Sequence, residues 1–181
     1  MIGWEILTEE SSESAAALLQ KISLREQLKP GQTILHSDNG SPMKGATMLA
    51  TLQRRGVVPS FSRPAVSNDN AYSEALFKTL KYMPSYPDWP FGTLVEAREW
   101  VNQFVLWYNL EHRHSDIQYV TPDQRHRGED VEILSKRKQV YEAARARNPS
   151  RWSGNTRNWE PVKSVTLNPN NHNKEGLKQA A

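Results

Sequence analysis

The sequence of 181 residues contains no cysteine. Disulfide frameworks, thiolate zinc sites, iron–sulfur clusters and cysteine nucleophiles are therefore excluded, and a reducing compartment fits this composition. No stretch approaches the roughly 18 consecutive apolar residues of a membrane span. The first residues also lack the basic start and the apolar run of a secretory signal. We therefore expect a cytoplasmic protein that does not enter a membrane.

The sequence also has little net charge. The 23 Lys and Arg residues against 20 Asp and Glu residues give a formal net charge of +3, which does not by itself indicate a polyanionic partner. The distribution is more informative, because residues 136–157 hold seven basic residues and one acid, Glu142. Such a cluster is typical of a phosphate-binding surface, and a solvated basic helix is the alternative explanation. The seven are Lys136, Arg137, Lys138, Arg145, Arg147, Arg151 and Arg157.

Apolar periodicity and turn residues predict strands and helices in alternation. The helix expected at residues 97–108 has the strongest apolar stripe in the chain and is predicted to lie in the core. Strands are predicted at residues 2–7, 33–36 and 57–61, and helices at residues 8–30, 42–56, 71–82, 97–108 and 131–147.

Two acidic residues stand where a site can form. Asp38 follows the predicted strand at 33–36, and Glu74 lies near the start of the predicted helix at 71–82. Strand ends in α/β sheets are frequent ligand sites, because side chains there project from a rigid element into a crevice. The alternative is ordinary, since turns favour Asp and the first turn of a helix favours Glu.

Two lysines follow Glu74 on the same helical face, Lys78 at i+4 and Lys81 at i+7. A carboxylate that holds a metal at a phosphodiester, beside cations that contact the backbone, suits metal-assisted phosphoryl transfer on DNA. A Glu–Lys pair at this spacing is equally an ordinary surface salt bridge worth about 0.2–0.5 kcal/mol. The spacing leaves both interpretations open.

Three ordered segments closely resemble the catalytic core of bacterial insertion-sequence transposases of the retroviral-integrase type. The resemblance runs from residue 1 to about residue 168 and implies an α/β fold of the RNase H-like (integrase core) class. An incomplete mixed sheet flanked by helices, followed by a basic C-terminal helix and a tail, is expected. The segments are His36-Ser37-Asp38-Asn39-Gly40, residues 69–81, and a block with Trp107-Tyr108-Asn109, Arg113-His114-Ser115 and Thr121-Pro122.

The resemblance implies DNA transposition and integration by metal-dependent nicking and joining of DNA strands. The family uses three acids, Asp, Asp and Glu, to hold two Mg²⁺ or Mn²⁺ ions. Asp38 matches the second acid and Glu74 the third, so both are predicted to be catalytic and metal-binding. Transposon ends and target DNA are the implied partners, and complete relatives are expected to form homo-oligomers on DNA. The predicted DNA-binding residues are Lys78, Lys81, Arg137 and Lys138.

The first acid of the family pattern has no counterpart here. In the family it lies on the first strand of the sheet, before a strand similar to residues 2–6, so Glu5, Glu9, Glu10 and Glu13 are not expected to replace it. We expect a two-metal site only in a complete protein and an inactive enzyme from this chain alone. A catalytically dead DNA-binding remnant of a mobile element is the alternative. An RNase H-like nuclease without transposition is less favoured, because the last two segments indicate integrase-type cores.

Three segments are expected along the chain. They are a partial catalytic core at residues 1–128, a basic helix with its extension at 129–167, and a disordered tail at 168–181. Within the extension, Arg151, Trp152, Arg157 and Trp159 alternate cations and aromatic rings. They are suited either to stack on unpaired bases or to dock onto the domain.

Overall fold

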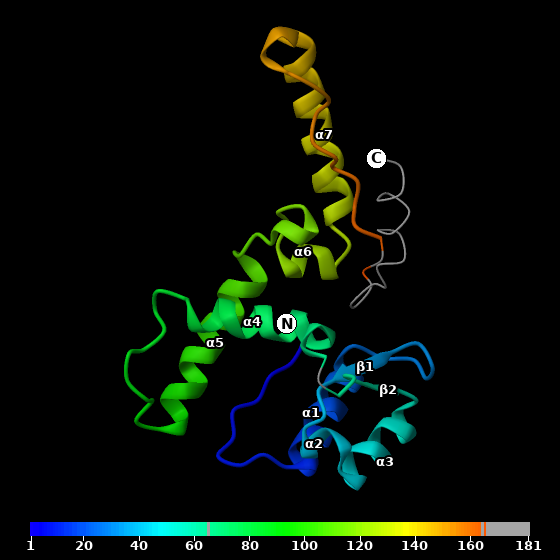
Figure 1. The fold of residues 1–181 in the computed structure, drawn as a ribbon, viewed down its shortest axis with the longest axis vertical. Helices are drawn as coiled ribbons and strands as arrows, with labels where there is room; N and C mark the ends of the chain where they lie inside the picture. Colours follow the sequence, from blue (N-terminus) through cyan, green and yellow to red (C-terminus); the bar gives the residue numbers. More distant parts are fainter. Residues whose placement is uncertain (65, 164, 166–181) are drawn as a thin grey trace, which may run out of the picture. The chain divides into compact units, whose positions relative to one another are not determined.

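The computed structural model describes residues 1–64, 66–163 and 165. Within these, the chain forms two compact units, which we call the N-terminal unit (residues 2–94) and the C-terminal unit (Met1 and residues 95–165). Figure 1 gives the order of the elements. The predicted tail at 168–181 lies outside the described residues, and the predicted boundary at residue 128 stays a prediction.

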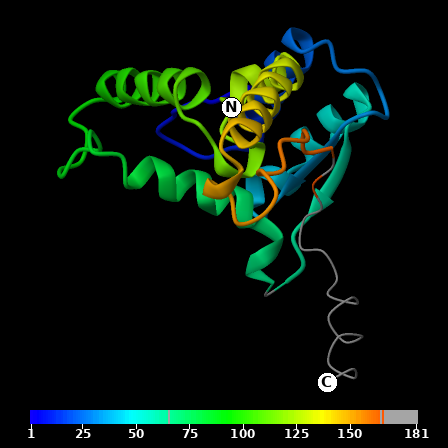
Figure 2. The same ribbon diagram turned by 90° about the horizontal axis from the view of Figure 1, so that it is seen from above.

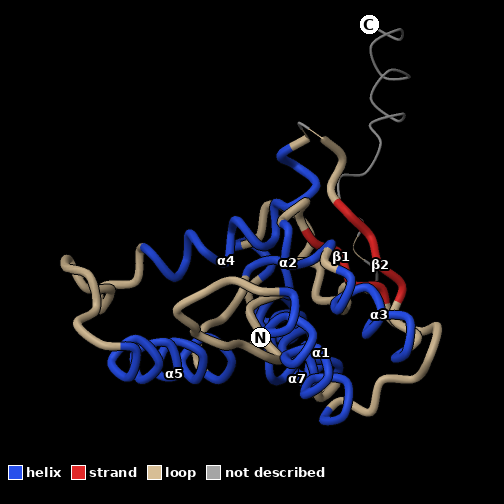
Figure 3. Tube along the Cα trace, turned by 90° about the horizontal axis from the view of Figure 1, so that it is seen from below, coloured by secondary structure: helices blue, strands red, loops and turns tan. Residues whose placement is uncertain are grey.

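The N-terminal unit is built on two parallel strands, β1 (Ile34–Ser37) and β2 (Val58–Phe61), with Ile34 opposite Val58 (Figure 3). Helices α2 (Ser41–Lys44) and α3 (Ala46–Arg55) form the crossover between them, as a parallel pair requires. The strands predicted at 33–36 and 57–61 are confirmed, each shifted by one residue at one or both ends.

The strand predicted at residues 2–7 does not form, and this segment has no regular secondary structure. A strand is held by hydrogen bonds to a neighbouring strand, and β1 and β2 make up the whole sheet among the described residues. Residues 2–7 therefore have no ladder to join. The described sheet is parallel, not the mixed sheet that was expected.

Helix α1 (Ser12–Arg25) packs against α2 and α3 on the sheet's crossover side. It begins later than predicted because Ser11 is the N-cap, its hydroxyl accepting a bond of 3.1 Å from the Ser14 backbone N–H. Gly45 separates α2 from α3, where one helix was expected. A Cβ at Gly45 would lie 2.4 Å from the Cβ of Ser12, so the bare backbone lets α1 approach. The core contains Ala16, Leu19, Met48, Leu52 and Val57.

A turn of 3₁₀ helix, η1 (Ser67–Asn70), leads into α4 (Ala71–Lys81), and no residue of α4 is buried. The predicted helix at 71–82 is thus confirmed to within one residue. Because α4 follows η1 directly, the position of η1 sets the position of Glu74 in the first turn of α4.

The C-terminal unit is helical. It contains α5 (Leu94–Leu110, whose first residue belongs to the N-terminal unit), η2 (Ser115–Ile117), α6 (Pro122–His126), α7 (Asp130–Arg147) and η3 (Pro149–Arg151). The predicted apolar stripe of α5 is buried at Ala97, Val101, Phe104 and Val105. After η3 the chain returns alongside α7 (Figures 1 and 2). This return places Trp159 in a second core with Val120 and Leu134.

Candidate functional site

Asp38 directly follows β1 and is exposed at the carboxyl end of the sheet. Its Oδ1 accepts a hydrogen bond of 3.0 Å from the backbone N–H of Gly40. The next side chain, Asn39, donates to the backbone oxygen of Ser62 at 2.8 Å, just beyond β2. The turn is thereby tied to the ends of both strands. The geometry leaves Oδ2 of Asp38 without a hydrogen bond to any described residue.

His36, two residues before Asp38, connects the sheet to η1. Its Nδ1 lies 2.9 Å from Ser60 Oγ on β2, and its Nε2 lies 2.9 Å from the backbone oxygen of Asp69. Because a carbonyl oxygen only accepts, Nε2 is the donor in the second contact. The imidazole therefore bridges β2 and the turn that precedes Glu74.

Asp69 is only 7% exposed and is held by Arg63. Its Oδ2 accepts from the backbone N–H and Nε of Arg63 at 2.9 Å each, and its Oδ1 accepts from Nη2 at 2.8 Å. This two-pronged contact is the geometry in which a guanidinium binds a carboxylate most specifically. The hydrogen bonds and negative charge of Asp69 raise the pKa of Arg63 above its ordinary value. Arg63 and Asp69 are thus tied together just before α4 begins.

Glu74 lies in the first turn of α4, exposed and without an ion-pair partner among the described residues. The surface salt bridge between Glu74 and Lys78, which was the alternative explanation of their spacing, is not formed. The ammonium groups of Lys78 and Lys81 are likewise exposed and free of acidic partners in the part of the chain that the structure describes. This face of α4 therefore presents one carboxylate and two cations to solvent.

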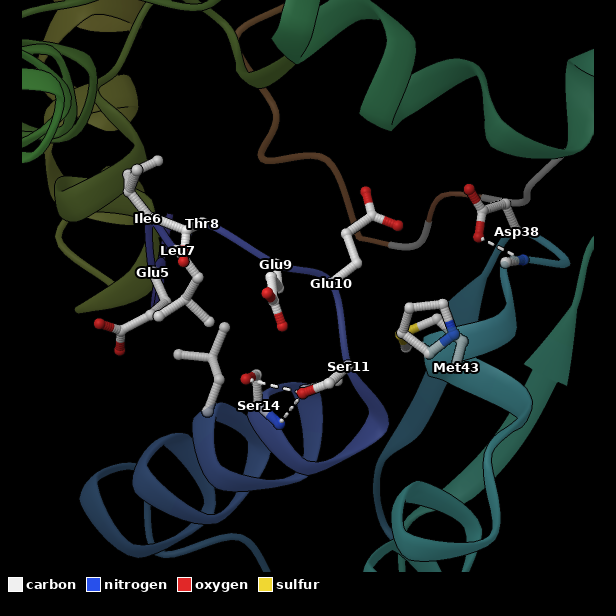
Figure 4. A pocket seen from close by; sticks show the side chains of 14 residues that line it. Glu5, Ile6, Leu7, Thr8, Glu9, Glu10, Ser11, Ser14, Asp38 and Met43 are labelled. Carbon is white, nitrogen blue, oxygen red and sulfur yellow. Dashed lines mark hydrogen bonds between the residues drawn. The ribbon is translucent and has the colours of Figure 1, made fainter. Parts of the chain in front are cut away.

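Asp38 also lines a pocket of about 620 Å³ between residues 5–11, α1 and the start of α2 (Figure 4). Three glutamates line it as well, Glu5, Glu9 and Glu10, of which Glu5 lies farthest from Asp38 in the figure. Sequence reasoning missed this proximity, because it arises from residues 5–10 folding back across α1. Glu74 is not among the lining residues.

The acidic side chains that the structure describes do not assemble a complete metal site. No group of three His, Asp or Glu side chains among the described residues is placed to hold a metal ion. Carboxylates are the right ligands for a hard cation such as Mg²⁺, but Asp38 and Glu74 by themselves are too few for the predicted two-metal centre.

The two predicted DNA-binding residues on α7 are engaged within their own unit. Arg137 donates from Nη1 to the backbone oxygen of Gln118 at 2.8 Å and from Nη2 to that of Tyr119 at 3.1 Å. Lys138 donates to Glu160 Oε1 at 2.8 Å. This pairing raises the pKa of Lys138 and lowers that of Glu160. DNA binding by Arg137 and Lys138 stays a prediction. A DNA phosphate would have to displace or share these internal contacts.

The aromatic residues of the extension dock onto the unit. Trp159 is 7% exposed. The guanidinium of Arg157 lies 4.6 Å from the ring centre of Tyr119 and 5.6 Å from that of Trp159. Of the two expectations for this segment, docking applies to Trp159, which is too buried to stack on a base.

Comparisons with known proteins agree with one another. A family model described as "Integrase core domain" matches residues 55–122, a range that includes Glu74 but not Asp38. The transposase for insertion sequence element IS904 of Lactococcus lactis is 28% identical over 123 residues, which cover 67% of this chain and 48% of that protein. The probable transposase for IS1353 of Shigella flexneri is 27% identical over 111 residues, covering 60% and 21%. The chain thus spans about half, or less, of the length of these curated relatives.

A solved structure supports the fold. The catalytic core domain of BIV integrase superposes with a TM-score of 0.50 at 16% identity, covering 70% of this chain and 77% of that one. At this identity the likeness establishes the fold alone, and it confirms the predicted RNase H-like class. No helix among the described residues is long and apolar enough to cross a bilayer.

Proposed function

We propose that this chain, a relative of insertion-sequence transposases with an integrase-type core, acts on DNA in transposition and integration. The observation that carries the proposal is the link between the two predicted acids. The His36 contact to Asp69 joins the strand that ends at Asp38 to the turn that precedes Glu74. An ordinary turn acid and an ordinary helix acid would not need this connection.

The exposed face of α4 supports DNA as the partner. Lys78 and Lys81 have no internal acid to neutralise them among the described residues, so they are available to phosphates. DNA binding through such cations releases counterions and weakens steeply with salt. Transposon ends and target DNA are the proposed substrates, in the cytoplasm, with homo-oligomers assembling on DNA in the complete protein.

The proposed chemistry is metal-dependent polynucleotidyl transfer with Mg²⁺ or Mn²⁺. Asp38 and Glu74 are the carboxylates that this chain contributes. Because no third ligand joins them among the described residues, we expect the chain alone to bind DNA without cutting it. The same observation favours the second candidate, a DNA-binding protein with no catalytic role.

The test compares the wild-type chain with Glu74→Gln on DNA that carries terminal inverted repeats, with Mg²⁺ or Mn²⁺ present. We expect salt-sensitive DNA binding by both proteins and no nicked or joined product from either. A product that requires metal and disappears in Glu74→Gln would show that this chain is a complete enzyme. Absence of salt-sensitive binding would overturn the proposed role on DNA.

A further inference from the structure

The cations of α7 and η3 fall into two groups according to their partners. Near the start of α7 the positive charges are used internally. Lys136 pairs with Glu132 at 2.6 Å, and Lys138 pairs with Glu160 at 2.8 Å. Arg137 donates to backbone carbonyls. The two lysines therefore add little net positive potential to the surface, whereas Arg137 keeps its charge but its Nη1 and Nη2 already donate to the two carbonyls.

The far end differs. Arg145 and Arg147 lie in the last turn of α7 and Arg151 in η3, and we call these three residues the distal tip. None of the three guanidinium groups meets an acid among the described residues. Within that part of the chain, their side chains make one hydrogen bond, of 3.4 Å from Arg147 Nε to the backbone oxygen of Ala143.

No acid lies close in sequence to neutralise the distal tip. Residues 143–159 contain neither Asp nor Glu. The nearest preceding acid, Glu142, accepts a hydrogen bond from the hydroxyl of Thr156. The distal tip therefore carries three uncompensated positive charges on a protein whose net charge is only +3.

Helix geometry alone does not explain this concentration of charge. Cations at a helix C-terminus are favoured by the helix dipole, but that effect falls off within the last turn. Arg151 lies beyond the end of α7, in η3. Trp152, the residue after Arg151, packs edge-on against Tyr141 of α7, with ring centres 6.1 Å apart. Arginines without acidic partners are suited to hold phosphate groups, which guanidinium binds in two-pronged fashion.

We propose that the distal tip binds the phosphate backbone of DNA and that it, rather than Arg137 and Lys138, is the DNA contact of α7. The inference rests on the proposed function, since it names a second surface by which the chain holds its DNA. The contact is to phosphate, so it is independent of base sequence.

The test uses the full chain and a labelled DNA duplex, with the binding constant measured against salt concentration. Each phosphate neutralised contributes about 0.9 to the slope of log K against log salt. The triple variant Arg145→Gln, Arg147→Gln, Arg151→Gln is expected to flatten that slope by about 2–3. It is also expected to weaken binding by at least about tenfold at low salt, the effect of losing about 1.4 kcal/mol.

A control variant removes the same net charge from cations that are ion-paired elsewhere. Lys21 pairs with Glu5, Arg25 with Glu26, and Arg127 with Asp123. Changing Lys21, Arg25 and Arg127 together to Gln is expected to leave the slope nearly unchanged.

The outcomes separate the two proposals. Salt-dependent binding by the wild type with an unaltered slope in the distal-tip variant overturns this inference and leaves the proposed function standing. An equal loss in the control variant also overturns it, because net charge would then account for the effect. If the wild type itself shows no salt-dependent binding, the proposed function fails. Circular dichroism of each variant checks that α7 remains helical.

Discussion

The imidazole Nε2 of His36 donates a hydrogen bond of 2.9 Å to the backbone oxygen of Asp69. His36 stands two residues before Asp38 and Asp69 five residues before Glu74. One side chain thus fixes the distance between the two segments that carry the predicted acids. Arg63 completes the arrangement by binding both carboxylate oxygens of Asp69.

Removing this bridge should loosen α4. His36→Ala removes the hydrogen bonds to the Asp69 backbone oxygen and to the Ser60 hydroxyl, which should lower the free energy of unfolding by about 1–3 kcal/mol. Two further variants, His36→Gln and His36→Asn, separate the role of Nε2 from that of Nδ1. The amide of Gln reaches the position of Nε2 and should keep the bond to Asp69, whereas Asn reaches only the position of Nδ1. Amide hydrogen exchange in residues 67–74 should be near normal in His36→Gln and fast in His36→Asn. Equal exchange in the two variants would contradict the bridging role.

Close backbone approach at Gly45 gives a second prediction. A Cβ there would lie 2.4 Å from the Ser12 Cβ, although the backbone angles suit any residue. Gly45→Ala should therefore force α1 away and cost about 1–3 kcal/mol of folding free energy, as overpacking does. A Cβ at Gly154 would meet no described atom within 4 Å. Gly154→Ala serves as the control, with an expected change within about 0.5 kcal/mol. Chemical denaturation measures both, and similar values for the two would refute the packing argument.

Trp159 should dominate the stability of the C-terminal unit. Its ring packs with Val120 and Leu134, and its indole Nε1 has no hydrogen-bond partner among the described residues. Trp159→Ala should cost about 3–5 kcal/mol through lost burial and the cavity left behind. Trp159→Phe should cost clearly less, because no hydrogen bond is lost with the indole nitrogen. Thermal unfolding followed by circular dichroism ranks the two, and a Phe variant as unstable as the Ala variant would contradict this ranking.

His112 predicts a pH dependence of stability. Its ring stacks on Tyr108, with ring centres 5.4 Å apart, and packs at a tilt against Trp107, with ring centres 4.9 Å apart. Burial, with a smaller effect of His114, lowers the pKa of His112 below the ordinary value of 6.5. The unfolded chain then binds this proton more readily than the folded chain does. Stability should be fully present above 6.5 and should fall as pH drops from there toward the lowered pKa. Denaturation midpoints across this range should depend less on pH in His112→Phe, which keeps the stacked ring. An unchanged pH profile would contradict the assignment.

Local patterns were sufficient for most of the elements and for the location of two exposed acids, but not for residues 2–7, where the predicted strand does not form. The apolar spacing of residues 97–108 predicted α5 and its buried face, since helix periodicity is set within a few turns. Asp38 was placed at a strand end because strand and turn residues adjoin it in sequence. These features depend on neighbours along the chain.

Contacts between distant residues were not predictable in this way. Glu9 and Glu10 reach the pocket of Asp38 because residues 5–10 cross α1, and no local pattern encodes that path. Arg137 looked like a free cation of a basic helix, yet its guanidinium is used by the carbonyls of Gln118 and Tyr119. Whether a cation is free for DNA is decided by what tertiary structure places beside it.

The lysines and the glutamate on α4 should affect DNA binding in opposite directions. Lys78 and Lys81 lie on the same face as Glu74, and none of the three has an internal ion-pair partner among the described residues. If this face contacts DNA, Lys78→Gln with Lys81→Gln should flatten the salt dependence of binding by about 2, at about 0.9 per phosphate. Glu74→Gln should tighten binding without metal, because it removes a negative charge facing the phosphates. Fluorescence anisotropy on one duplex measures both variants. Weaker binding by the lysine variant and tighter binding by Glu74→Gln would show that α4 contacts DNA. If both variants bind as the wild type does, α4 is not involved.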